Sequence, residues 1–192
     1  MTGEGGTMTN KRPEIKFKLA LVGENGVGKT ALIQRFVYDV FKDAYVATLG
    51  MKLTKKEVRA APPGSSDRVL VTLMIWDIMG QKSVRSLLQD SFFTGAQGIL
   101  MVCDVTRPST LSELDGWKHS VQSVAGEVPA YLLANKADLK DAAKLVVEDI
   151  ESASRKWGCP YLFTSAKTGQ GVEDGFRGIT ELILQKVLAQ TH

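Results

Sequence analysis

Residues 23–30, GENGVGKT, combine glycines with a lysine and a hydroxyl side chain at a spacing that suits phosphate binding. Glycines let backbone N–H groups converge on phosphate oxygens, and a helix that begins there adds partial positive charge. Lys29 would reach the β and γ phosphates, and the Thr30 hydroxyl would coordinate Mg²⁺. A Gly-rich turn without function is the alternative. The predicted phosphate-binding residues are Glu24, Asn25, Gly26, Val27, Gly28, Lys29, Thr30 and Ala31.

Two later motifs indicate which base accompanies the phosphates, because a phosphate loop alone is shared with many ATPases. In NKAD, Asp138 would accept from the ring N–H and the exocyclic amine of guanine, whereas adenine presents an acceptor at its ring nitrogen. In SAK, the Ala166 N–H would donate to guanine O6. NKxD as a plain helix cap is the alternative. The predicted guanine-binding residues are Asn135, Lys136, Asp138, Ser165, Ala166 and Lys167, the lysines lying with their stems against the base faces.

The stretch WDIMGQ ends an apolar run and carries groups suited to sensing a third phosphate. Asp77 would hold Mg²⁺ through water, the Gly80 N–H would approach the γ-phosphate, and Gln81 would orient an attacking water. Thr48 offers a second hydroxyl for the metal. The alternative is that Asp77 and Gly80 merely form a turn at the end of a strand and that Thr48 merely begins the next one. We therefore predict Gln81, Lys29 and Thr48 as catalytic residues and Thr30, Thr48 and Asp77 as metal ligands.

Strand-like apolar runs alternate with helical patterns along the chain, which predicts a mostly parallel sheet covered on both faces. The stretch APPGSSD joins two runs as an antiparallel hairpin. Ligands in such sheets bind at the carboxyl ends of the strands. We expect strands at 15–23, 51–60, 68–77, 98–105, 130–136 and 159–165. We expect helices at 29–38, 109–125, 147–157 and 172–189, with Ser109 or Thr110 capping the second.

Length and composition indicate a single domain, and we place this α/β domain at 15–192 behind a flexible lead-in at 1–14, with monomer as the default. The chain has 192 residues, 44% of them hydrophobic, and a formal net charge of +3, which favours neither nucleic acid nor a membrane surface as partner. Cys103 and Cys159 lie in apolar runs, as is usual in a reducing compartment. We expect a cytoplasmic protein without a lipid anchor, because position 2 is Thr2 and the C-terminal VLAQTH contains no cysteine.

In these motifs and their order the sequence resembles the Ras superfamily of small GTPases, over residues 15 to 189. The stretches YVATLGMKL and FFTGA are more similar to the Rab branch than to Ras, and DVTRPSTL also resembles the septum-promoting GTPases related to Rab. The resemblance implies a P-loop NTPase three-layer sandwich, with a six-stranded sheet containing one antiparallel strand. It implies GTP, GDP and Mg²⁺ as ligands, and effectors, exchange factors and GTPase-activating proteins as partners. It also places Phe41 at the guanine edge and Tyr45 over the γ-phosphate.

Several residues depart from the family pattern and keep a second function open. Asn25 stands where Ras has a glycine, and Met79 and Lys82 replace the usual residues beside Gln81. One hypothesis is a switch that hydrolyses GTP slowly, which the presence of Gln81 favours. The other is a GTP-loaded binding scaffold with vestigial hydrolysis. An ATP-dependent enzyme is a third possibility, against which NKAD argues.

Overall fold

The computed structural model describes residues 15–42, 48, 50–78, 80 and 90–190. Its strands form one six-stranded sheet in the order β2-β3-β1-β4-β5-β6. Among the described strands, β2 alone is antiparallel to its neighbour, and the other pairs are parallel. This confirms the predicted sheet. The strands are β1 (Ile15–Val22), β2 (Met51–Ala60), β3 (Val69–Ile78), β4 (Gly98–Asp104), β5 (Ala130–Asn135) and β6 (Tyr161–Thr164).

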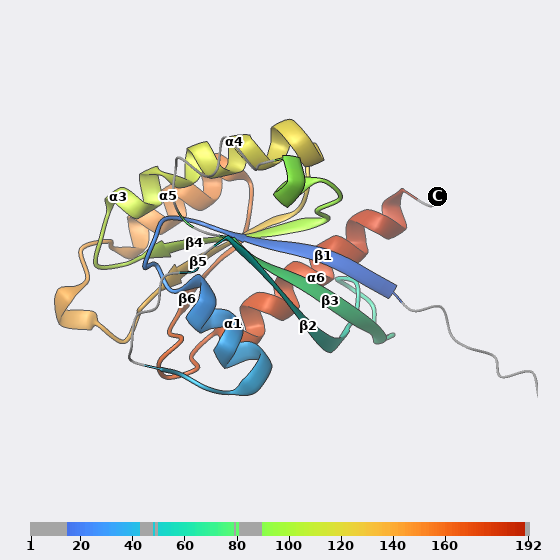
Figure 1. The fold of residues 1–192 in the computed structure, drawn as a ribbon, viewed down its shortest axis with the longest axis horizontal. Coiled ribbons are helices and arrows are strands. Elements are labelled where there is room, and N and C mark those ends of the chain that lie inside the picture. The colour runs from blue at the N-terminus through green and yellow to red at the C-terminus, as the bar shows by residue number, and fades with distance from the viewer. Residues whose placement is uncertain (1–14, 43–47, 49, 79, 81–89, 191–192) are drawn as a thin grey trace, which may run out of the picture.

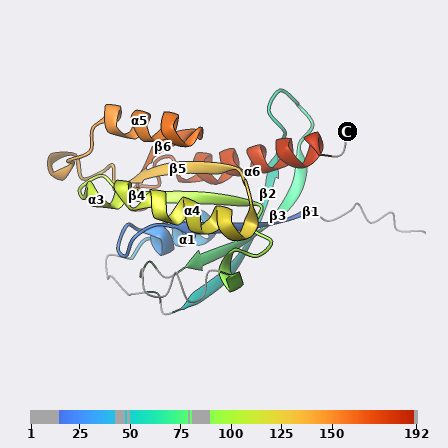
Figure 2. The same cartoon turned by 90° about the horizontal axis from the view of Figure 1, so that it is seen from above.

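Helices cover both faces of this sheet and give the molecule three layers (Figures 1 and 2). One buried cluster joins α1 and α6 to the sheet through Leu32 and Phe176, and another joins α4 and α5 through Trp117 and Ile150. In the described part of the chain, no helix is both long and apolar enough to cross a membrane. The helices are α1 (Lys29–Tyr38), α3 (Ser109–Ser112), α4 (Leu114–Ala125), α5 (Val147–Trp157) and α6 (Val172–Ala189), with a 3₁₀ turn at Lys140–Ala142.

Two expected elements differ from the structure. The helix expected at 109–125 is divided into α3 and α4, and Pro108, rather than Ser109 or Thr110, occupies the position before α3. Thr110 does not cap because its hydroxyl donates to the Arg107 carbonyl and accepts from the Asp104 N–H. The last strand begins at Tyr161 rather than 159, since Pro160 has no N–H to contribute to a ladder. The predicted antiparallel hairpin is confirmed, with Ala60 paired to Val69.

The topology gathers the chemistry-bearing motifs at one edge of the sheet. Five strands run parallel, so their carboxyl ends meet there. These ends are followed by the phosphate loop after β1, Gly80 after β3, the Asp104 loop after β4, NKAD after β5 and SAK after β6. Phosphate, metal and base motifs that lie far apart in sequence are therefore neighbours.

Helix α1 is fixed against α6 by two stacked rings. The Phe36 and Phe176 centroids lie 4.0 Å apart with an interplanar angle of 1°. Phe176 is fully buried, and Phe36 is 5% exposed. Such pairs contribute beyond the area that they bury. Because α1 begins at the phosphate loop, this stack also supports the site.

We predict that Phe176→Ala lowers the free energy of unfolding by about 3–5 kcal/mol, since it leaves a cavity between α1 and α6. Urea denaturation at a fixed excess of GDP measures the change. Tyr38→Ala is the control, because Tyr38 ends α1, the helix against which Phe176 packs, and is 59% exposed. It should cost no more than roughly 0.5 kcal/mol. Equal losses in the two variants would contradict the role given to the stack.

Candidate functional site

A cleft of about 560 Å³ opens at the carboxyl edge of the sheet. Gln34, Lys42, Ile78 and Leu139 also line it, although none of them was predicted as a site residue. The predicted site residues that line it are Asn25, Gly26, Gly28, Lys29, Thr30, Ala31, Phe41, Thr48, Gly80, Asn135, Lys136, Asp138, Ala166 and Lys167. The structure thus brings most of the predicted residues together in one place.

The phosphate loop has a backbone path that side chains would obstruct. Gly28 has φ of 101°, and a Cβ there would lie 2.3 Å from Asn135 Nδ2. A Cβ at Gly80 would lie 2.5 Å from the backbone nitrogen of Asn25. Gly28 also stands directly before α1, where it has no side chain to occupy the first N–H groups of the helix. Those groups are left to face an anion in the cleft.

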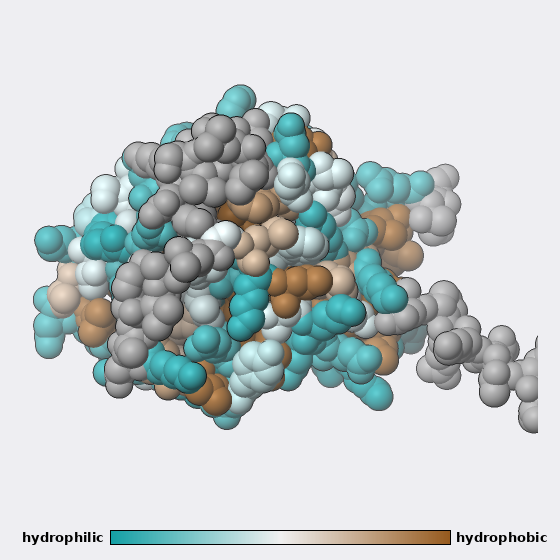
Figure 3. Space-filling view, in the orientation of Figure 1, coloured by the Kyte–Doolittle hydropathy of each residue, from teal (hydrophilic) through white to brown (hydrophobic). Residues whose placement is uncertain are grey.

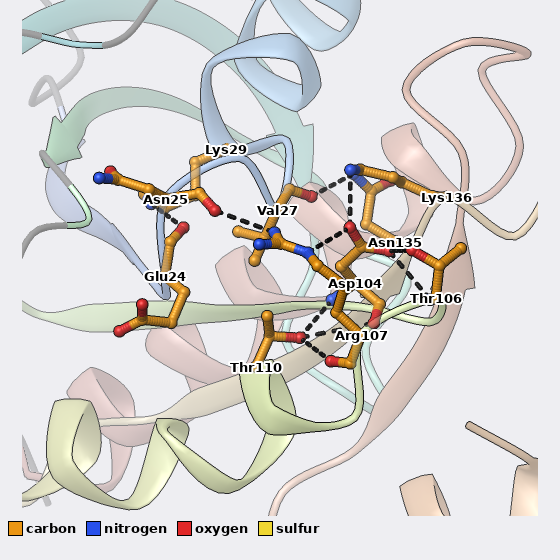
Figure 4. Close-up of polar contacts among 10 residues, drawn as sticks. All are labelled: Glu24, Asn25, Val27, Lys29, Asp104, Thr106, Arg107, Thr110, Asn135 and Lys136. Atoms are coloured by element: carbon orange, nitrogen blue, oxygen red, sulfur yellow. Dashed lines mark hydrogen bonds and ion pairs between the residues drawn. The ribbon is translucent and has the colours of Figure 1, made fainter. Parts of the chain in front are cut away.

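The carbonyl groups of the loop accept hydrogen bonds from three side chains, two of which lie outside the loop. Lys29 Nζ donates to the carbonyls of Gly23 at 2.7 Å and of Glu24 at 3.0 Å. Asn135 Nδ2 donates to Val27 O at 2.8 Å. Arg107 Nη2 donates to Asn25 O at 2.9 Å (Figure 4). With their carbonyls engaged in this way, these peptides keep their N–H groups for phosphate oxygens.

Lys29 is a buried cation, 6% exposed, beside this loop. Burial lowers the pKa of Lys29 to about 8, whereas the carboxylates of Asp77 and Glu24 act to raise it and the positive charge of Arg107 adds to the lowering. A phosphate group in the cleft would supply the opposite charge that this ammonium needs. The environment therefore favours a polyanionic ligand.

Glu24 has a side chain that is not engaged in the phosphate loop. It is half-buried, and its Oε1 is buried without a hydrogen-bond partner among the described residues. Its carboxylate points away from Lys29 and Arg107 in Figure 4. Within the predicted phosphate set, Glu24 and Val27 contribute backbone that is held by other residues.

Three oxygen-bearing side chains meet beside the start of α1. Thr30 Oγ1 lies 2.6 Å from Asp77 Oδ2 and 2.8 Å from Thr48 Oγ1. Asp77 is 1% exposed, and its Oδ1 has no hydrogen-bond partner in the described part of the chain. Burial raises the pKa of Asp77, and the hydrogen bond from Thr30 and the charge of Lys29 act against that rise.

This group of oxygens fits Mg²⁺, which prefers hard oxygen ligands and keeps several waters. The unpartnered Asp77 Oδ1 is the kind of buried atom that a cation or its water would satisfy. Among the described residues there is no group of three or more His, Cys, Asp or Glu side chains that could hold a metal. A magnesium ion here would rely on threonine hydroxyls and on the phosphates of its nucleotide.

At the base end of the cleft, most of the predicted groups hold one another. Asp138 Oδ1 accepts from the Ser165 hydroxyl at 2.6 Å. Asn135 Oδ1 accepts from the Ala166 N–H at 3.3 Å, the donor that we predicted for guanine O6. Because the Asn135 amide also donates to the phosphate loop, its contacts favour a positioning role. The Lys136 ammonium forms an ion pair with Asp104 at 2.6 Å, and the expected contact of the Lys136 stem with the base stays a prediction.

Two arginines support the site although neither belongs to a predicted site motif. Arg35 of α1 donates from Nε to Ala166 O at 2.9 Å and from Nη2 to Lys167 O at 2.7 Å. Arg107 holds Asn25 from the loop after β4. Their only signal in the sequence is position, one late in α1 and one just after a strand whose carboxyl end faces the site. Gln81, Tyr45, Met79 and Lys82 lie outside the described residues, so their predicted roles stay predictions.

The six-stranded sheet, with a phosphate loop and a cleft at its carboxyl edge, has the architecture of a P-loop nucleotide-binding fold. A sequence model of the Ras family matches residues 18–185. The Ras-related protein RABD2c of Arabidopsis thaliana is 32% identical over 182 residues, or 94% of this chain and 87% of its own length. Human Ras-related protein Rab-27B is 33% identical over 186 residues, covering 94% and 85%. Bovine Ras-related protein Rab-13 is 31% identical over 171 residues, covering 88% and 81%.

The chain therefore belongs to the Ras family of small GTPases, and its relatives include Rab proteins. Guanine nucleotides are the ligands of this family, as the NKAD and SAK motifs predicted. GTPase switching is its general activity. The fold expected from the resemblance is confirmed.

We predict that Thr30→Val speeds release of fluorescent GDP in the presence of Mg²⁺ and blunts the further acceleration by a chelator. The substitution keeps the side-chain shape and removes one of the oxygens beside Asp77. Stopped-flow release with and without EDTA measures both effects. Thr94→Val is the control, because the Thr94 hydroxyl donates to Asp90 O on the exposed surface. A wild-type chelator response in Thr30→Val would contradict the proposed ligand.

Proposed function

We propose that this protein is a Mg²⁺-dependent GTPase with slow intrinsic turnover, which binds effectors in its GTP state. The observation that carries the proposal is the contact of Thr30, Thr48 and Asp77, which joins three separate segments at one point. Thr30 opens α1, Thr48 precedes β2 and Asp77 lies near the end of β3. A metal and a γ-phosphate at this point would bind all three segments together.

The chemistry proposed for the site is positioning and electrostatic stabilisation, without a covalent intermediate. Lys29 and the loop N–H groups would neutralise developing negative charge on the phosphates. Gln81 would orient the attacking water. The bound Mg²⁺ would supply further charge neutralisation from its place beside Thr30, Thr48 and Asp77.

Hydrolysis would act as the switch because two segments approach the γ-phosphate end of the cleft. Thr48 contacts Thr30 through its hydroxyl, and Gly80 lies against Asn25. Loss of the γ-phosphate would remove contacts from the loops at roughly 39–49 and 78–94. A partner that reads the GTP form discriminates only by its difference in affinity for the two states.

We place the effector surface on the outer side of β2 and β3, next to these loops. Met51 and Leu53 are 39% and 41% exposed, and Trp76 is half-buried beneath Lys18, whose Nζ lies 4.3 Å from a Trp76 ring centroid. Figure 3 presents apolar surface in this region, with hydrophilic residues around it. Exposed apolar patches of this kind are typical of protein interfaces. Val46 and Leu49, which precede β2 in the sequence, lie outside the described residues.

A cytoplasmic, monomeric protein that reaches membranes through protein partners completes the proposal. Cys103 and Cys159 are both free and buried, as is usual in a reducing compartment. The alternative function is a GTP-loaded scaffold with vestigial hydrolysis. It is favoured by the position of Asn25, whose Oδ1 would lie 2.8 Å from a Cβ at Gly80 and so occupies space beside the γ-phosphate end.

We expect the purified protein to carry GDP or GTP, to exclude ATP in competition, and to convert bound GTP to GDP in single-turnover assays only when Mg²⁺ is present. Gln81→Leu should slow this conversion at least about tenfold, because the water loses its orienting group. Chromatography of the released nucleotide measures both. Retention of GTP without conversion would favour the scaffold function. Unaltered turnover in Gln81→Leu would contradict the water-positioning role of Gln81.

We also predict that Asn25→Gly increases stimulation by an activating protein while leaving GDP affinity nearly unchanged. The Asn25 side chain occupies the space through which an activator's arginine would approach, and such an arginine contributes about 10³ to 10⁵ in rate. Intrinsic and stimulated single-turnover rates should be compared with an activator shown to act on the wild type. If both rates match the wild type, Asn25 does not restrict activation.

A further inference from the structure

Arg107 makes a contact that no motif predicted. It follows β4 by three residues and extends back to the phosphate loop, where its Nη2 donates to the Asn25 carbonyl at 2.9 Å. Its Nε donates to Asp104 Oδ2 at 3.0 Å. Figure 4 shows the guanidinium between these two acceptors. One planar group thus connects the loop to a buried carboxylate.

Asp104 is the fixed point of this connection. It is 1% exposed, and its Oδ1 accepts from both the N–H and the hydroxyl of Thr106, at 2.9 and 2.7 Å. Its Oδ2 receives Arg107 and also the Lys136 ammonium, at 2.6 Å. Burial alone would raise the pKa of Asp104, but the hydrogen bonds from Lys136 and Thr106 outweigh it and leave the pKa lowered. The carboxylate is therefore a stable anion with every oxygen in use.

The backbone of Arg107 is held as firmly as its side chain. Its carbonyl accepts from the Thr110 hydroxyl at 2.7 Å, and the same hydroxyl accepts from the Asp104 N–H at 2.9 Å. The Arg107 N–H donates to Asp104 O at 2.9 Å. The guanidinium is thus presented to Asn25 from a loop with little freedom, although its side chain is 44% exposed.

Two side chains from outside the phosphate loop hold it at different ends. Asn135 holds the Val27 carbonyl next to the start of α1. Arg107 holds the Asn25 carbonyl at the end that touches Gly80, the residue assigned above to the γ-phosphate. A loss of the first anchor would disturb the part of the loop that faces every phosphate. A loss of the second would act mainly where the third phosphate lies.

We propose that Arg107 is a positioning residue that sets the γ-phosphate end of the loop and links it, through Asp104 and Lys136, to the base end of the cleft. This rests on the proposed nucleotide switch. Arg107 distinguishes the triphosphate from the diphosphate by holding Asn25 against Gly80. Arginine is required because one planar fork serves two acceptors at once, whereas a lysine ammonium at the same place would serve one.

Release of fluorescent GDP and of a fluorescent, non-hydrolysable GTP analogue tests the proposal on the full chain with Mg²⁺ present. We expect Arg107→Ala to speed release of the triphosphate analogue about five- to tenfold and that of GDP less than about twofold, the range for one charged hydrogen bond at a half-exposed site. Arg107→Lys should still release the analogue at least about twofold faster than the wild type. Arg107→Lys also allows the proposal to be tested if Arg107→Ala folds poorly.

Arg155→Ala is the matched control, because Arg155 lies on α5, is 72% exposed and pairs with Glu151 at 3.6 Å. It should leave both rates unchanged. Equal acceleration of both nucleotides in Arg107→Ala would indicate general support of the fold and overturn the proposal. Unchanged rates, or full restoration by lysine, would overturn it as well. A wild-type chain that retains neither nucleotide would instead refute the proposed function.

Discussion

The constraint on which this structure depends is that a backbone can face a polyanion only if its carbonyl groups face something else. The loop at 23–30 turns N–H groups toward the cleft, and an unpaired carbonyl behind them would be costly to bury. Lys29, Asn135 and Arg107 supply the missing donors. These donors come from α1, from the end of β5 and from the loop after β4. The phosphate cradle therefore depends on two side chains from elsewhere on the sheet edge, Asn135 and Arg107, as well as on its own Lys29.

The other features follow from this arrangement. Parallel strands are needed because only they bring the ends of β1, β4 and β5 to the same edge. Glycine is needed at Gly28 because Asn135 occupies the place of a side chain. The same packing keeps Lys29 buried. Burial lowers the pKa of Lys29, and an anion in the cleft would stabilise its charged form. Affinity for phosphate and stability of the fold are thus supported by the same contacts.

The sheet and most of the residues that line the cleft could be predicted from the sequence, because local patterns indicate both. Alternating apolar runs set the strands to within two residues, and short motifs marked their carboxyl ends. Sequence failed where a side chain had competing partners. Thr110 was expected to cap a helix but bonds within the Asp104 loop. Arg35 and Arg107 were invisible because their acceptors are backbone carbonyls remote in sequence.

Helix α1 has a geometric consequence of its own. Its first residue, Lys29, stands at the phosphate loop, while Arg35 holds the carbonyls of Ala166 and Lys167 in the base loop. The two positions are six residues apart, about 9 Å along a helix that rises about 1.5 Å per residue. Helix α1 thus fixes the distance between the phosphate loop and the base loop. A nucleoside without phosphates would leave the phosphate loop without the anion that its N–H groups face.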